Sequence, residues 1–321
     1  MGFWLRVLTA LAFFALPAVA DAQDFPTRPV RVVVPQSPGG VTDVIARAVA
    51  QRLSEMWGQP VVVENKPGAN YQIGATFVAK AEPDGYTLLV MSEAFTINPL
   101  LNAKLSYDPK DFAPITGLIS INHALTTHPS LPASSVAELI ALARQKPGEL
   151  NYGTYGPGST GHLNMEMFQR MAGAKLVPVH YKGAAPALTD VIAGHIPMMF
   201  ISVGSVVDSW KAKALKILGI GSAQRMPQLP DIPTIAESGL PDFRAVTWFG
   251  LFTTAGVPHD IIARINEDVR RIVADPVFRE RFLAPQLFEP MTSAPDQFTA
   301  FLQGETAKWS KVIHDANIKV E

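Results

Sequence analysis

The chain has 321 residues, a hydrophobic fraction of 48% and a formal net charge of −1. This composition predicts a globular protein rather than a disordered one. The sequence has no basic stripe, which argues against nucleic-acid binding. The sequence has no cysteine, which excludes disulfides, thiolate metal sites, a cysteine nucleophile and a lipid anchored on cysteine.

The first residues have the pattern of a secretion signal. Arg6 and the free amine precede an apolar run over residues 7–16, and Ala20-Asp21-Ala22 is a small-x-small cleavage site. The run is shorter than the roughly 20 residues that a membrane-spanning helix requires. We therefore predict a signal peptide over residues 1–22, with cleavage after Ala20 as an alternative, and a mature protein retained in the periplasm.

Short β-rich runs then alternate with helical patterns. The first series has strands at residues 30–34, 61–64 and 87–91, with helices at 41–57 and 73–81. The second has helices at 136–145, 161–172, 186–193 and 206–212, and strands at 150–154, 176–180, 196–202 and 215–220. The remaining elements are β-like segments at 115–127 and 245–254, and helices at 259–274, 276–283 and 295–316.

This alternation predicts an α/β fold in which each lobe is a mixed, mostly parallel sheet flanked by helices. The mature length suits two lobes better than one core. We expect the segments at 115–127 and 245–254 to cross between the lobes. Lobe 1 would then comprise residues 23–124 and 250–321, lobe 2 would comprise residues 125–249, and the ligand cleft would lie between them.

Two Gly-rich loops mark the expected site. Residues 35–40 and residues 155–161 each follow a strand and precede a helix, so backbone N–H groups and the positive end of a helix dipole converge there. Ligands in such sheets bind beyond the carboxyl ends of the strands. The first loop has no Lys or Arg, so we expect backbone dipoles to hold a small anion.

Enzyme interpretations have less support. Gly156–Gly161 matches G-x-G-x-x-G, but the next strand ends in Tyr181-Lys182 instead of the acid that a dinucleotide site needs. The residues around Ser159 do not match the hydrolase motif G-x-S-x-G. The histidines do not have the spacing of metal ligands. We expect that the protein binds no cofactor and no metal and is not an enzyme. The alternative is a secreted hydrolase or oxidoreductase that uses this loop.

Several motifs together resemble a known family. They are Val34-Pro35-x-x-Pro38-Gly39-Gly40-x-x-Asp43-x-x-Ala46-Arg47, Ala79-Lys80-Ala81-x-Pro83-Asp84-Gly85-Tyr86, Gly158-Ser159-x-x-His162-Leu163 and Leu229-Pro230-Asp231-Ile232-Pro233-Thr234. In this order they resemble the Bug-type periplasmic receptors, the substrate-binding proteins of tripartite tricarboxylate transporters. The resemblance spans the whole mature chain.

The resemblance implies a two-lobed periplasmic binding protein of the Venus-flytrap kind, type II-like. It implies a small carboxylate ligand (a di- or tricarboxylate, an amino acid or an aromatic acid) delivered to the membrane subunits of a transporter. We expect a monomer. A receptor that passes its signal to a sensor kinase is a further alternative.

The resemblance also implies a set of ligand contacts. From the two loops we expect Gln36, Ser37, Gly39, Gly40, Asp43, Tyr155, Gly158, Ser159 and Thr160 to bind the ligand. From other strand ends and loops we add Tyr71, Ser92, Thr96 and Ser202. Each has a structural alternative: Asp43 suits a helix dipole, Ser159 and Thr160 suit a helix cap, and Tyr71 lies in an Asn70-Tyr71-Gln72 segment where the family has small residues.

Overall fold

The computed structural model describes residues 25–102, 104–316 and 318, so the predicted signal peptide at residues 1–22 lies outside the described residues. The strands are β1 (Val30–Val34), β2 (Val61–Asn65), β3 (Thr87–Ser92), β4 (Phe112–Thr127), β5 (Asn151–Thr154), β6 (Val177–His180), β7 (Met198–Ser202), β8 (Lys216–Ile220), β9 (Val246–Thr254) and β10 (Phe288–Pro290). The α-helices are α1 (Val41–Trp57), α2 (Gln72–Ala79), α3 (Ala94–Leu101), α4 (Val136–Gln145), α5 (Thr160–Ala172), α6 (Ala184–Ile192), α7 (Val203–Lys211), α8 (His259–Ala274), α9 (Pro276–Phe278) and α10 (Pro295–Asp315).

The strands form a 10-stranded sheet in the order β2-β1-β3-β9-β4-β7-β5-β6, with β8 and β10 also paired to β4. Within the first lobe β1 runs parallel to β2 and β3, and within the second β5 runs parallel to β6 and β7. The strands β4 and β9 are antiparallel to their neighbours. The predicted α/β fold with mixed sheets is confirmed, and its parallel pairs are those within β2-β1-β3 and within β6-β5-β7.

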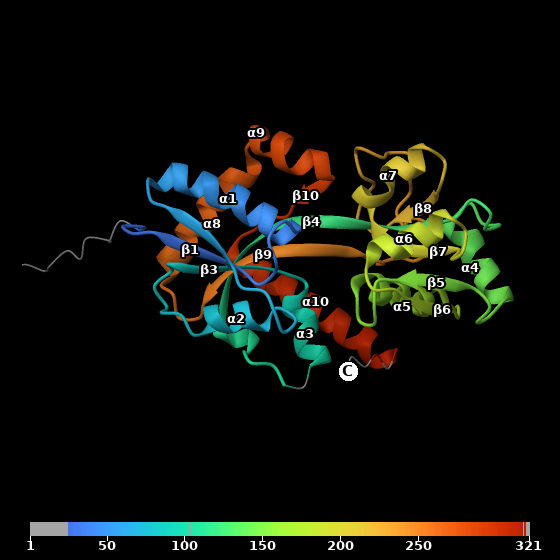
Figure 1. The fold of residues 1–321 in the computed structure, drawn as a ribbon, viewed down its shortest axis with the longest axis horizontal. Helices are drawn as coiled ribbons and strands as arrows, with labels where there is room; N and C mark the ends of the chain where they lie inside the picture. The colour runs from blue at the N-terminus through green and yellow to red at the C-terminus, as the bar shows by residue number, and fades with distance from the viewer. Residues whose placement is uncertain (1–24, 103, 317, 319–321) are drawn as a thin grey trace, which may run out of the picture.

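The long strand β4 connects the two lobes. Its residues Phe112–Asn122 pair with β9, and His123–Thr127 pair with β7. Figure 1 shows the two lobes side by side with β4 running from one into the other. Two strands thus lie where the sequence places its crossing segments, while the proposed lobe boundaries at residues 124/125 and 249/250 stay a prediction.

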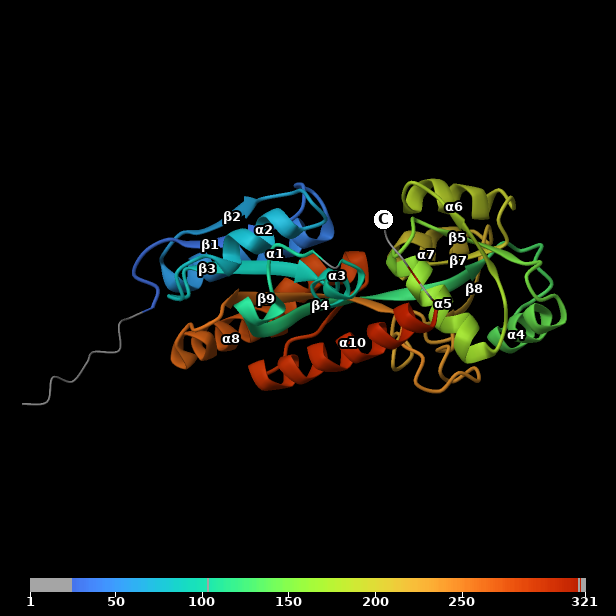
Figure 2. The ribbon, with the colours of Figure 1, turned by 90° about the horizontal axis from the view of Figure 1, so that it is seen from below.

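The C-terminal helix α10 contacts both lobes. It packs on α3 in the first lobe, and Trp309, Val312 and Ile313 belong to the same buried cluster as Phe168 of α5 in the second. Figure 2 shows α10 running along the first lobe and ending beside α5. The end of the chain is therefore a third connection between the lobes.

Separate apolar cores support each lobe. One joins β1 and β3 to α1 and α8, and a second, on the other face of that sheet, includes residues of α2, α3 and α10. The second lobe has its own clusters around Phe200 and around Met199. No helix among the described residues has both the length and the hydrophobicity that crossing a bilayer demands.

Three local features differ from the sequence-based prediction. The helix α3 and the short strand β10 were not expected. The helix predicted over residues 276–283 is α9 followed by a π-helical turn at Arg279–Leu283. Helix α3 keeps Pro99 in its interior, although proline cannot donate a backbone hydrogen bond, and the helix packs against α10.

Candidate binding site

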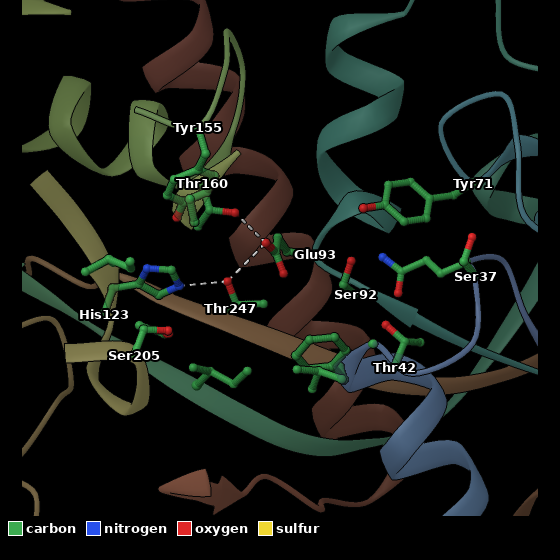
Figure 3. A pocket seen from close by; sticks show the side chains of 18 of the residues that line it. Ser37, Thr42, Tyr71, Ser92, Glu93, His123, Tyr155, Thr160, Ser205 and Thr247 are labelled. Atoms are coloured by element: carbon green, nitrogen blue, oxygen red, sulfur yellow. Dashed lines mark hydrogen bonds between the residues drawn. The ribbon is translucent and has the colours of Figure 1, made fainter. Parts of the chain in front are cut away.

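A cavity of about 560 Å³ lies between the lobes. Its lining comes from the carboxyl ends of strands in both lobes and from the crossing strands β4 and β9 (Figure 3). The residues that line it are Gln36, Ser37, Pro38, Gly40, Val41, Thr42, Tyr71, Ser92, Glu93, Ile121, His123, Tyr155, Thr160, Ala184, Ile201, Ser202, Ser205, Thr247 and Phe249.

Helices begin at this cavity because parallel strands end there. The chain passes from β1 into α1, from β5 into α5, from β6 into α6 and from β7 into α7, and each helix presents a first or capping residue to the cavity. The first N–H groups of a helix have no partner within it, and the helix dipole is positive at that end. Among the described lining residues there is no Lys or Arg, so these N-termini are the main source of positive potential.

The first Gly-rich loop is held by an internal carboxylate. The backbone N–H of Gly39 donates to Asp43 Oδ2 at 3.0 Å, and Arg47 and Asn65 also donate to this carboxylate. These donors lower the pKa of Asp43 although burial opposes them. Asn65 in turn donates to the carbonyl of Gln36 at 3.0 Å. Asp43 therefore shapes the loop and, like Gly39, does not line the cavity.

The second Gly-rich loop has the same internal arrangement. The N–H of Gly158 donates to His162 Nδ1 at 3.1 Å, four residues further along, as Gly39 does to Asp43. Ser159 accepts from the N–H of His162 and caps α5. Gly158 and Ser159 line a smaller adjoining cavity of about 220 Å³, whereas Tyr155 and Thr160 reach the main one.

The structure brings most of the expected contacts together. Eight of them line the main cavity, as the lining set above shows: Gln36, Ser37, Gly40, Tyr71, Ser92, Tyr155, Thr160 and Ser202. Five do not: Gly39, Asp43, Thr96, Gly158 and Ser159. Thr96 is buried in α3, where its hydroxyl donates to the carbonyl of Glu93 at 2.9 Å.

A left-handed turn carries Tyr71 to the cavity. Ala69, Asn70 and Tyr71 have φ values of 46°, 49° and 74°, a conformation that costs about 1–2 kcal/mol for each residue with a side chain. Asn70 exchanges hydrogen bonds with Asn98 of α3, and Gln72 accepts from the N–H of Ser106. Of the unusual Asn70-Tyr71-Gln72 segment, only Tyr71 lines the main cavity.

Glu93, His123 and Thr247 were not expected at the site. Glu93 Oε1 accepts from Thr160 at 2.7 Å and from Thr247 at 3.1 Å, so it joins the two lobes (Figure 3). Burial raises the pKa of Glu93 to about 7 and lowers that of His123 to about 4. The sequence signal was a lone acid directly after a strand end, beside Ser92.

The cavity also has an apolar side. Ile121, Ile201 and Phe249 project from β4, β7 and β9 into the same space as the polar groups. One part of the cavity therefore offers helix N-termini to a ligand, and another part offers aliphatic or aromatic surface. This combination suits a small organic anion with a carbon body, because a pocket of this kind gains affinity from apolar contact and orientation from polar groups.

Several proteins of known sequence or structure are similar to this chain over nearly its whole length. Protein BugT of Bordetella pertussis is 34% identical over 99% of this chain and 97% of its own length. An R. palustris protein solved with adipate is 36% identical, with a TM-score of 0.75 over 92% of this chain and 99% of that one. The protein MatC of Rhodopseudomonas palustris, solved with malate, is 30% identical, with a TM-score of 0.70 over 90% of this chain and 100% of that one.

The family model that matches is described as the tripartite tricarboxylate transporter family receptor, and it covers residues 45–318. The match and the full-length relatives confirm the resemblance that the motifs indicate, as well as the two-lobed periplasmic binding protein fold. The chain belongs to the receptor family of tripartite tricarboxylate transporters.

Proposed function

We propose that this protein is a periplasmic receptor that binds one small carboxylate in the cavity between its lobes and delivers it to the membrane subunits of a tripartite transporter. It acts as a monomer and is not an enzyme. The observation that carries the proposal is the convergence of helix N-termini from both lobes on a cavity without Lys or Arg among its described lining residues.

The relatives support the ligand class. Adipate and malate, named in the structures of two relatives, are both dicarboxylates. In the cavity of this protein, the N-termini of α1, α6 and α7 can hold the carboxylate of such a ligand. Ile121 and Phe249 give the cavity its apolar surface. A carboxylate gains charge-assisted hydrogen bonds at such N–H groups, which a neutral ligand does not.

Two measurements on the purified mature protein test the proposal. Native mass spectrometry of freshly purified protein should reveal a monomer with a co-purified organic acid. A thermal-shift screen should then find stabilisation by carboxylates, because a ligand at 100 times its dissociation constant adds about 2.7 kcal/mol. A screen in which nucleotides stabilise the protein and no carboxylate does would contradict the proposal.

A pull-down addresses delivery. Ligand-loaded protein should retain the membrane subunits of a tripartite transporter from solubilised membranes. Retention of a sensor kinase instead would support the receptor role but assign it to signalling.

A further inference from the structure

The side chain of Glu93 has an unusual position in a cavity built for an anion. It lies between β3 and α3, is 7% exposed, and is the only acid among the described residues that line the cavity. Figure 3 shows it in the middle of the cavity, between the side chains of the two lobes. A carboxylate placed there repels a second one, so its presence restricts which acids can bind.

The hydrogen bonds of Glu93 leave one oxygen free. Thr160 and Thr247 both donate to Oε1, and Thr247 Oγ1 lies 2.9 Å from His123 Nε2. Since the Thr247 hydroxyl proton points to Glu93, His123 is the donor in the second bond. The other oxygen, Oε2, is buried and has no hydrogen-bond partner among the described residues.

A buried carboxylate oxygen without a donor is unfavourable. Leaving such a group unpaired costs more than an ordinary lost hydrogen bond, so native proteins rarely leave a buried polar group without a partner. The groups that face Glu93 do not relieve it: neither the Tyr71 nor the Tyr155 hydroxyl is hydrogen-bonded to Oε2, His123 is neutral, and Glu305 of α10 adds a like charge. A donor on the ligand would give Oε2 the partner that it lacks.

We propose that Glu93 Oε2 accepts a hydrogen bond from a protonated nitrogen of the ligand, and that this receptor selects small zwitterions over plain dicarboxylates. The inference rests on the proposed function, since it assumes that a carboxylate occupies the helix N-termini. The ligand then has its carboxylate at those N-termini, its ammonium group at Glu93 and its carbon body against Ile121, Ile201 and Phe249. Glu93 is thus a specificity-determining residue.

The test compares acids that differ only in the amino group. Calorimetry on the mature protein uses L-glutamate against glutarate and L-phenylalanine against 3-phenylpropionate, together with the same comparison for any acid found in the thermal-shift screen. In at least one pair we expect the amino member to bind at least tenfold more tightly at pH 8. Glu93→Gln should remove that preference, because the amide cannot offer a charged acceptor.

Glu289→Gln is the matched control. It removes one carboxyl group from β10, outside the cavity lining, and should leave the preference for the amino member intact. The pH dependence gives a second readout: between pH 8 and pH 6 the amino member should lose about tenfold in affinity, since Glu93 takes up a proton near pH 7. Glu93→Gln should abolish this dependence.

Each other outcome decides against the inference. If the acids without an amino group bind as tightly or more tightly, and gain affinity at pH 6, Glu93 is a neutral donor to a ligand carboxylate and the inference is wrong, although the proposed function stands. If Glu93→Gln leaves the preference unchanged, another group recognises the ammonium. If no carboxylate in the pairs or the screen binds, the proposed function fails, and the inference fails with it.

Discussion

The burial of Glu93 predicts a stability cost that depends on pH. Burial raises the pKa of Glu93 from 4.5 to about 7. Below pH 4.5 the carboxyl group is protonated in both the folded and the unfolded protein and contributes no pH dependence. As pH rises from 4.5 to 7 the unfolded chain releases its proton first, so stability falls, and above pH 7 the loss is complete. At about 1.4 kcal/mol per pKa unit the total is roughly 3 kcal/mol.

Glu93→Gln should remove this loss. The amide oxygen can still accept from Thr160 and Thr247, so the contact between the lobes can remain. Urea unfolding at pH 5 and pH 8 should show that the variant gains stability relative to the natural protein, with a gain about 2.5 kcal/mol larger at pH 8 than at pH 5. Comparing the two proteins at each pH cancels the titration of all other groups. A gain that is the same at both pH values would refute the raised pKa.

Three further substitutions test the site. Gly40→Val should keep the fold, because a Cβ at Gly40 meets no atom within 4 Å, but it should weaken carboxylate binding at least tenfold by filling the cavity. The control Gly304→Val, at an equally open position on α10, should bind carboxylates with the affinity of the natural protein. Unchanged affinity in Gly40→Val would show that the first loop is not part of the binding site. Ala69→Gly should raise the free energy of unfolding by about 1 kcal/mol by relieving the left-handed backbone, whereas a loss of stability in urea titrations would deny that strain. Tyr71→Ala should lower the affinity for aromatic acids more than the affinity for succinate, as measured by calorimetry. An equal effect on both affinities would show that Tyr71 has a structural role and does not contact the ligand.

Strong local periodicity explains what the sequence could predict of the fold. The strand at Val30–Val34 and the helices at Val41–Trp57, Val136–Gln145 and His259–Ala274 have the predicted bounds, because apolar spacing and flanking breakers agree there. Helix α3 escaped notice because Asn98-Pro99 resembles a break. Its stability comes from burial against α10, which lies about 200 residues away in the sequence and cannot be read locally.

The sequence could predict the parts of the candidate site that a local sequence pattern marks. The turns before α1 and α5 could be found from their glycines, but not that Asp43 and His162 occupy the N–H groups of Gly39 and Gly158. Glu93 could be seen only as a lone acid after a strand.

The neighbours of Glu93 depend on strand pairing. The register that sets Ile121 opposite Thr247 brings β9 beside His123, and the lobes must meet before Thr160 can reach Glu93. Long-range pairing of this kind has no signature in a single local segment.

The most direct test of the central claim is calorimetry with a carboxylate and its primary amide. The acid should be the one that stabilises the mature protein most in the thermal-shift screen, and the amide should have the same carbon body. If helix N-termini hold the ligand as an anion, the acid binds one to one and the amide binds at least tenfold more weakly. Equal affinity for the acid and the amide would contradict the account, because it would show that the negative charge contributes nothing to recognition.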